Sequence, residues 1–228
     1  MYSVIECQVY YPIFGGQQDH YLQQIVSPFK DVEGLHFKFH YNLYHKYVSR
    51  CMSDQPPAGT VKSILPCTPL AVVKCLEHIG IYNRLLPYGD RAYGKTVTVI
   101  NRSEVVGRPL AALLANDGAR VFSVDIDSIQ ACIHHFQSTD AARRYHPRHV
   151  VHPSTLSLEE CLAFSDVIVS AVPNASYKVK TALLKDGCVC INVAADKNFE
   201  ADVREKASLY MPTIGKVTIM MLLRNLCV

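Results

Sequence analysis

From residue 96 onward, short apolar runs alternate with amphipathic segments. The run 96–100 is followed by a turn, a helical pattern over 109–116 and a second apolar run over 120–124. Two strands joined by so short a crossover form a βαβ unit, in which the strands are parallel. The runs 167–171 and 188–193 are apolar throughout, as in strands covered on both faces. The pattern predicts an α/β fold with a doubly wound, Rossmann-type parallel sheet.

Ahead of this unit, the pattern predicts a mixture of strand and helix that belongs to a different unit. Residues 4–11 are typical of a strand, and a short helix is expected over 19–26. The clearest helix has Thr68 as its cap and Pro69 at its first helical position, and Gly80 ends it. The C-terminal stretch also predicts an apolar helix.

The stretch 126–165 is polar and rich in histidine, with weak periodicity. We interpret most of it as a surface insertion. Within it, Ser157 and Glu160 predict a capping box for a helix that continues through Ala163.

Three histidines in this stretch, His146, His149 and His152, are spaced by three residues. Such spacing could align ligands for a metal ion on a helix, but Pro147 opposes that helix, and no nearby cysteine or acid pair completes a tetrahedral set. We therefore expect an exposed loop here and no metal.

Composition and charge exclude several classes of function. The 228 residues are 49% apolar and 19% charged, and the net charge of +3 is dispersed, which argues against a nucleic-acid partner. No apolar stretch approaches the roughly 20 residues that a membrane helix needs, and the first residues do not resemble a secretory signal. The nine dispersed cysteines favour free thiols in a reducing cytosol. We expect a cytoplasmic protein without a membrane partner.

The turn after the run 96–100 has features of a dinucleotide site. Gly107 precedes a helix whose N–H groups and dipole would face a diphosphate, although Asn101 stands where a glycine-rich motif has its first glycine. Asp125 ends the next strand, where a carboxylate can bind the ribose hydroxyls of adenosine and repel a ribose phosphate. These residues favour NAD over NADP. The alternative is that Asp125 is simply a solvated residue at a strand end.

Three segments, 27–34, 65–70 and 102–109, strongly resemble the methylenetetrahydrofolate dehydrogenase/cyclohydrolase family in order and spacing. Asn101 and Asp125 are most similar to its monofunctional, NAD-dependent fungal members. The resemblance implies hydride transfer from 5,10-methylenetetrahydrofolate to NAD, giving the 5,10-methenyl cation, as in one-carbon metabolism and purine synthesis. It also implies a homodimer with tetrahydrofolate as its small-molecule partner.

The same resemblance implies a division into domains. Residues 1–80 would form a folate-binding α/β domain that lacks its opening stretch, and residues 81–210 would form the NAD-binding Rossmann domain. Residues 211–228 would form a helix that returns to the first domain. Because the opening stretch would supply core strands and a wall of the folate pocket, an inactive remnant that binds NAD or acts as a structural partner remains an alternative.

The resemblance further assigns residues to the cofactor. The residues implied at the diphosphate are Arg102, Ser103 and Gly107. Those implied at the adenosine are Asp125 and Ile126, and those implied at the nicotinamide are Val193, Ala194 and Ala195.

Tyr10, Glu33 and Cys67 are the residues implied at the substrate. Glu33 occupies the position of the family's pterin-binding aspartate, where a carboxylate can accept paired N–H donors, and the alternative is a solvated turn acid. Cys67 precedes a helix whose dipole could lower the thiol pKa for a catalytic or positioning role, and a plain buried cysteine is the alternative.

Three departures from the family pattern predict that cyclohydrolase activity is absent. No Tyr-x-x-x-Lys spacing occurs before Cys67, Tyr10 stands where bifunctional members have glutamine, and the proline- and glycine-rich loop is shortened to residues 213–217.

Overall fold

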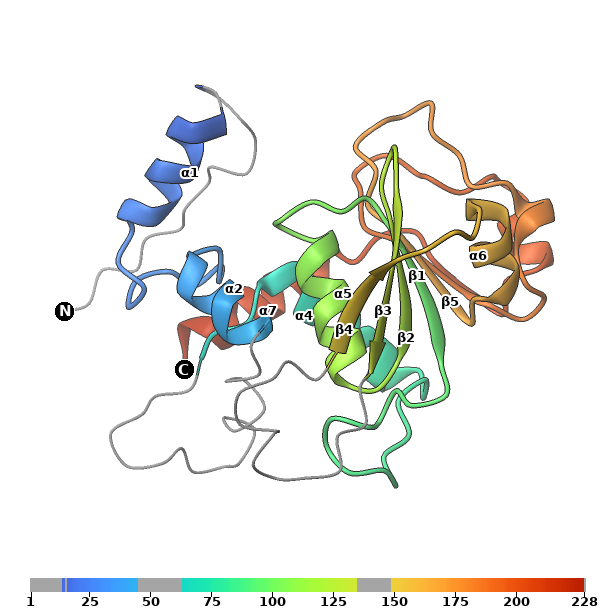
Figure 1. Cartoon of the computed structure of the whole chain (residues 1–228), viewed down its shortest axis with the longest axis horizontal. Helices are drawn as coiled ribbons and strands as arrows, with labels where there is room; N and C mark the ends of the chain where they lie inside the picture. The colour runs from blue at the N-terminus through green and yellow to red at the C-terminus, as the bar shows by residue number, and fades with distance from the viewer. Residues whose placement is uncertain (1–13, 15, 45–62, 135–148, 228) are drawn as a thin grey trace.

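The computed structural model describes residues 14, 16–44, 63–134 and 149–227. Its centre is a seven-stranded sheet in the order β4-β3-β2-β1-β5-β6-β7, and Figure 1 shows α1 and α2 gathered at one side of it. The strands are Thr96–Ile100 (β1), Arg120–Val124 (β2), Ile129–His134 (β3), His149–Pro153 (β4), Val167–Ser170 (β5), Val189–Asn192 (β6) and Leu209–Met211 (β7). The helices are Gly16–Ile25 (α1), Phe37–Tyr44 (α2), Cys67–His78 (α4), Gly107–Asn116 (α5), Leu158–Phe164 (α6) and Gly215–Leu226 (α7), with short 3-10 helices at Thr181–Leu183 (η2) and Val203–Glu205 (η3).

The predicted βαβ unit is confirmed. Strands β1 and β2 pair in parallel with Thr96 opposite Arg120, and α5 connects them. The later apolar runs form β5 and β6, which continue the parallel part of the sheet, and β7 completes it. The predicted helix over 19–26 corresponds to α1, whereas the strand predicted over 4–11 lies outside the described residues.

Both faces of the sheet are covered, as the apolar strands predict. One core cluster joins Val97, Val99 and Val169 to side chains of α4, α5 and the start of α7. A second cluster joins Ile168 and Cys190 to α6, η2 and η3 on the opposite face. In β5 and β6, successive residues alternate between the two clusters because side chains of a strand point to opposite faces.

The interpretation of 126–165 as mostly a surface insertion is wrong for two segments. Strand β3 pairs antiparallel with β2, and β4 pairs antiparallel with β3, so that Ala131 lies opposite His152. The sheet is therefore mixed and not purely parallel. In β4 only His149 is buried while the last three residues are exposed, so this edge strand shows little of the apolar alternation that would reveal it.

The predicted capping box in the same stretch is confirmed. The Ser157 hydroxyl accepts a hydrogen bond from the Glu160 N–H at 3.2 Å, and the Glu160 carboxylate accepts one from the Ser157 N–H at 2.8 Å. Helix α6 begins directly after Ser157.

The predicted exposed histidine loop is wrong where the structure describes it. His149 is buried in β4, and its Nδ1 lies 2.9 Å from Oδ1 of Asn116 at the end of α5. His152 is also part of β4, while His146 lies outside the described residues. Within the described part of the chain, no three histidine, cysteine or acidic side chains are grouped to hold a metal ion.

Helix α4 begins earlier than predicted. Pro66 is its capping residue, and the Leu70 N–H donates to the Pro66 carbonyl at 3.0 Å, so the predicted cap at Thr68 is wrong. Proline fits this boundary because it has no N–H that needs a partner. Gly80 ends the helix as predicted, with a φ of 81° that glycine adopts without strain.

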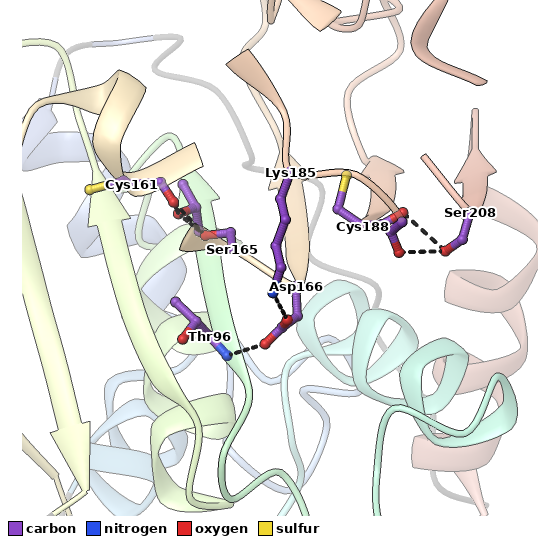
Figure 2. A network of polar contacts seen from close by, with 9 residues as sticks. Thr96, Cys161, Ser165, Asp166, Lys185, Cys188 and Ser208 are labelled. Carbon is purple, nitrogen blue, oxygen red and sulfur yellow. Dashed lines mark hydrogen bonds and ion pairs between the residues drawn. The ribbon is translucent and has the colours of Figure 1, made fainter. Parts of the chain in front are cut away.

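Polar contacts fix the amino ends of the parallel strands (Figure 2). The Asp166 carboxylate accepts from the Thr96 N–H at 2.9 Å and pairs with Lys185 Nζ at 2.6 Å. The Ser208 hydroxyl donates to the Cys188 carbonyl at 3.2 Å. These contacts join the starts of β1, β5, β6 and β7, and the opposite, carboxyl edge of the sheet carries the predicted cofactor residues.

In the described residues no helix combines the length and the apolar character needed to cross a membrane.

Candidate active site

The turn that connects β1 to α5, residues 101–107, is called the cofactor turn below. Asn101 has a φ of 87°, a left-handed conformation that asparagine tolerates better than most residues. Its amide donates to the Ala171 carbonyl at 2.7 Å, and its Oδ1 accepts from the Ser103 N–H at 3.0 Å. Asparagine can therefore replace the first glycine of the dinucleotide motif, because its side chain stabilises the turn that the glycine would otherwise permit.

Ser103 and Gly107 set the start of α5. The Ser103 hydroxyl accepts from the N–H groups of Val106 at 3.3 Å and Gly107 at 3.5 Å. The Ser103 carbonyl accepts from the Arg108 N–H at 3.0 Å. Gly107 is buried, and a Cβ there would overlap the Asn101 carbonyl oxygen. The turn is thus closed against the N-terminus of a ten-residue helix, where the dipole favours an anionic group.

Asp125 follows β2 in a short turn over residues 125–128, called the Asp125 turn. Its carboxylate is exposed, and the backbone N–H of Asp125 donates to the Ser128 carbonyl at 2.9 Å. The side chain of Ile126, 95% exposed, stands next to it. A carboxylate and an apolar side chain are both available here to a ligand at the carboxyl end of β2, where parallel α/β sheets bind ligands.

Arg102 supports the Asp125 turn. Its guanidinium donates to the Ser123 hydroxyl at 3.2 Å and to the Ser123 carbonyl at 2.7 Å. It also donates to the hydroxyl and the carbonyl of Ser128, each at 2.9 Å. These contacts tie Arg102 to the Asp125 turn, and the contact of Arg102 with the diphosphate that the resemblance implies stays a prediction.

The third strand end, after β6, carries Val193, Ala194 and Ala195. The Val193 N–H donates to the Ser170 carbonyl at 2.8 Å, which continues the pairing with β5. Buried Asn192 donates from its amide to the Ala194 carbonyl at 2.8 Å. The structure therefore brings the three predicted cofactor segments to one edge of the sheet, since β1, β2 and β6 are parallel.

A tight turn over residues 31–36, called the Glu33 turn, carries Glu33, whose carboxylate is predicted to bind the substrate. The Asp31 carboxylate accepts from the N–H groups of Glu33 at 3.0 Å, Gly34 at 2.9 Å and His36 at 2.8 Å. Glu33 is only 8% exposed, so the alternative of a solvated turn acid is wrong. Gly34, at φ 76°, lies so close to the backbone of Leu65 that a side chain would force the two segments apart.

Cys67 lies against the Glu33 turn. Its N–H donates to the Glu33 carbonyl at 3.2 Å, and its thiol lies 3.3 Å from the Val32 carbonyl. Burial, followed by the negative charge of Glu33, raises the pKa of the Cys67 thiol to about 12. A thiol with this pKa is protonated at neutral pH, which favours the alternative of a plain buried cysteine over a catalytic thiolate.

Asn225 and Asp31 are two residues of this site that sequence reasoning missed. The Asn225 amide donates to the carbonyls of Val32 and Leu65. A single amide near the end of an apolar helix is the signal that could have indicated a buried polar contact. The predicted substrate residue Tyr10 lies outside the described residues.

Comparisons with known proteins agree with this geometry. Residues 66–142 match the family model described as "Tetrahydrofolate dehydrogenase/cyclohydrolase, NAD(P)-binding domain". Methylenetetrahydrofolate dehydrogenase [NAD(+)] of Schizosaccharomyces pombe is 52% identical over 225 residues, which are 98% of this chain and 67% of that protein. The protein of the same name from Saccharomyces cerevisiae is 52% identical over 228 residues and is covered to 68%. The chain belongs to the methylenetetrahydrofolate dehydrogenase family.

A solved structure supports the same membership. The NAD-dependent 5,10-methylenetetrahydrofolate dehydrogenase of S. cerevisiae superimposes with a TM-score of 0.83 at 51% identity, covering 95% of this chain and 66% of that chain. The resemblance and the α/β fold predicted from the sequence are therefore confirmed. The dehydrogenases of both yeasts are NAD(+)-dependent by name, in agreement with the cofactor preference predicted from Asp125. The chain spans about two thirds of the length of these relatives.

Proposed function

We propose that the chain catalyses the NAD-dependent oxidation of 5,10-methylenetetrahydrofolate to 5,10-methenyltetrahydrofolate. One observation carries this proposal: the same fold contains two features. The first is the cofactor turn, with Asp125 at the end of the next strand, and the second is the Glu33 turn with its buried carboxylate. Both lie in a chain half identical to NAD-dependent members of the family.

The residues of the sheet edge fit a dinucleotide. The cofactor turn and the N-terminus of α5 receive the diphosphate, and Asp125 accepts hydrogen bonds from the adenosine ribose hydroxyls. A 2′-phosphate at that ribose would lie against the Asp125 carboxylate and be repelled, which favours NAD. The segment after β6, with Val193, Ala194 and Ala195, lies on the nicotinamide side. NAD supplies a two-electron acceptor at its nicotinamide ring.

The substrate side needs recognition and orientation more than acid–base chemistry. The methylene carbon loses a hydride, that is, a proton with two electrons, and the positive charge that results is shared by the two folate nitrogens. No proton has to be moved by the protein in this step. Glu33 accepts N–H donors of the pterin ring and fixes its orientation, and the protonated Cys67 thiol packs beneath the turn without acting as a nucleophile.

We further propose that cyclohydrolase activity is absent. The relatives from the two yeasts, each 52% identical to this chain, are named only as NAD(+)-dependent methylenetetrahydrofolate dehydrogenases. Tyr10 in place of the family glutamine and the shortened loop over 213–217 support the same conclusion. Methenyltetrahydrofolate should therefore accumulate as the product.

The cellular setting is also a proposal. We propose a homodimer in the cytoplasm, by analogy with the family and because the cysteines of the described residues are all free thiols. Sedimentation velocity would detect a monomer as a species of about half the expected mass, and such a result at micromolar concentration would contradict the dimer.

Turnover and ligand-induced stabilisation together separate the enzyme from its alternative, a remnant that only binds NAD. The chain is mixed with NAD and methylenetetrahydrofolate, and NADH formation is followed by its absorbance. Thermal unfolding is recorded with NADH and with tetrahydrofolate separately. An active enzyme forms NADH and is stabilised by both ligands. A chain stabilised by NADH alone, with no NADH formed, would show that the remnant is the correct description.

A further inference from the structure

Asn225 is buried between two segments that approach it from opposite directions. Its side chain is 3% exposed, and its Nδ2 donates to the Val32 carbonyl at 3.0 Å and to the Leu65 carbonyl at 2.9 Å. The same nitrogen lies 3.5 Å from Cys67 Sγ. A primary amide has two N–H donors, so this one group satisfies two buried carbonyls that would otherwise lack these partners.

The two carbonyls belong to the segments that define the Glu33 turn. Val32 immediately precedes Glu33, and Leu65 belongs to the segment on which Gly34 packs without room for a side chain. The hydrogen bond from the Cys67 N–H to the Glu33 carbonyl joins the same two segments. Asn225 thus holds together the two backbone segments whose separation sets the position of the Glu33 carboxylate.

The helix that carries Asn225 reaches the cofactor side at its other end. Helix α7 packs along α4 (Figure 1). Just before it, the Pro212 carbonyl accepts from the Asn192 amide at 3.2 Å, and the same amide donates to the Ala194 carbonyl after β6. Ile214, the capping residue of α7, is buried in the main core. One short helix therefore joins the nicotinamide side to the Glu33 turn.

We propose that Asn225 is a positioning residue for the folate substrate: through Val32 and Leu65 it holds Glu33 at a fixed place relative to the segment after β6. This inference rests on the proposed function, because it takes Glu33 as a group that contacts the pterin. A hydride transfer is sensitive to the separation and alignment of its two partners, and misplacement of one by about 1 Å can lower the rate by about a hundredfold.

The test compares Asn225→Ala with Asn116→Ala. Asn116 also donates from its amide to a backbone carbonyl, that of Leu43 in α2 at 3.1 Å, and its Oδ1 lies 2.9 Å from His149 Nδ1 in β4. Neither of these two partners belongs to the Glu33 turn. Each variant is measured for kcat, for KM with methylenetetrahydrofolate and with NAD, and for thermal stability. A purely structural loss lowers the active fraction and leaves both KM values unchanged. A positioning loss lowers kcat and also raises KM for the folate, while KM for NAD stays unchanged.

We expect Asn225→Ala to raise KM for the folate by about tenfold, which corresponds to about 1.4 kcal/mol, with KM for NAD unchanged. Asn116→Ala should change neither KM. Asn225→Gln is the second variant, for the case in which the alanine variant does not fold. It keeps both donors on a longer side chain that displaces the two segments, so it should also raise KM for the folate. A folded variant at position 225 with a wild-type KM for the folate would overturn the proposal.

A second measurement separates this proposal from the proposed function. Hydrogen exchange of the backbone N–H groups of residues 31–36 is followed in the free protein, so that no turnover is required. Faster exchange in Asn225→Ala than in Asn116→Ala supports the positioning role even if the wild-type chain forms no NADH, a result that would contradict only the proposed function. Equal exchange in the two variants would overturn the positioning role.

Discussion

Gly107 packs directly against the carbonyl group of Asn101, leaving no room for a side chain at position 107. Asn101 holds this arrangement from its left-handed conformation, and its side-chain amide donates to the carbonyl of Ala171, the residue directly after β5. The pair closes the cofactor turn on the start of α5. The shape of the turn therefore depends on contacts within the chain and on the absence of a methyl group at position 107.

Replacing Gly107 with alanine should open this turn. The added Cβ meets backbone atoms, which cannot rotate away as a side chain could, so we expect a loss of about 1–3 kcal/mol in the free energy of unfolding. NADH affinity should fall by at least about tenfold because the N-terminus of α5 moves away from the diphosphate. Gly215→Ala is the matched control, since Gly215 also begins a helix and a Cβ there meets only Thr213 at an ordinary 3.8 Å. Equal NADH affinity in the two variants would contradict the prediction.

Replacing Asp125 with serine should change the cofactor preference. The variant loses the hydrogen bonds to the ribose hydroxyls and the repulsion of a 2′-phosphate, while the Arg102 guanidinium remains beside the same turn. We expect the ratio of kcat/KM for NAD to kcat/KM for NADP to fall by about ten- to a hundredfold. This change corresponds to the loss of about 1–3 kcal/mol of interaction energy that favours NAD. Asp127→Ser, two residues further along the same turn, should leave the ratio unchanged. A ratio that moves equally in both variants would point to a general effect of charge.

The Cys67 thiol should resist alkylation in the folded protein. Because burial raises its pKa to about 12, only about 10⁻⁴ of it is thiolate at pH 8. Cys227 is exposed and should react with iodoacetamide first. Peptide mapping after a short exposure at pH 8 gives the order of modification, and Cys227→Ser removes the fast site. Modification of native Cys67 as fast as in denaturant would contradict the assignment of a buried, protonated thiol.

The free energy of unfolding should depend on pH through the ionisation of Asp166. Burial opposes its ionisation, but hydrogen bonds from Lys185 and the Thr96 N–H outweigh this effect and lower the pKa of its carboxyl. A depressed folded-state pKa stabilises the fold above the unfolded pKa of about 3.9, and this stabilisation is lost as pH falls through the folded value. Asp166→Asn should therefore cost about 1 kcal/mol at pH 7 and less near pH 3, which lies below the unfolded pKa. Urea unfolding at both pH values measures the difference.

The matched variant for this experiment is Asp186→Asn. Its carboxylate is 89% exposed and lies 3.9 Å from Lys206 Nζ, a pair too solvated to contribute measurably. Its free energy of unfolding should follow that of the wild type at both pH values. A similar loss in the two variants would indicate a response to net charge and not to the contacts of Asp166.

The sequence predicted the parts of the fold in which hydrophobic pattern and turn chemistry agree. The apolar runs of β1, β2, β5 and β6 and the Ser157 capping box are local signals, and each appears in the structure where it was expected. Strand β4 was missed because its stability comes from pairing with β3 and from the contact of His149 with Asn116, partners far away in sequence. The start of α4 was misplaced because proline is compatible with both the capping and the first helical position.

The candidate site shows the same division between local and long-range information. Asn101, Gly107 and Asp125 were assigned to the candidate site from their place in one βαβ unit, and the structure places them at the carboxyl ends of β1 and β2 and at the start of α5. The sequence left two alternatives open for Cys67, because the helix dipole is a local effect whereas burial of the thiol depends on the Glu33 turn and on α7. Asn225 could not be assigned from the sequence, since its partners Val32 and Leu65 lie about 190 and 160 residues earlier in the chain.

The most direct test of the account is a calorimetric titration of the wild-type chain with NADH and, separately, with NADPH. The exposed Asp125 carboxylate at the end of β2 should accept the ribose hydroxyls of NADH and repel the phosphate of NADPH. We predict one NADH bound per chain, with at least about tenfold weaker binding of NADPH. Absence of binding by both nucleotides, or tighter binding of NADPH, would contradict the account.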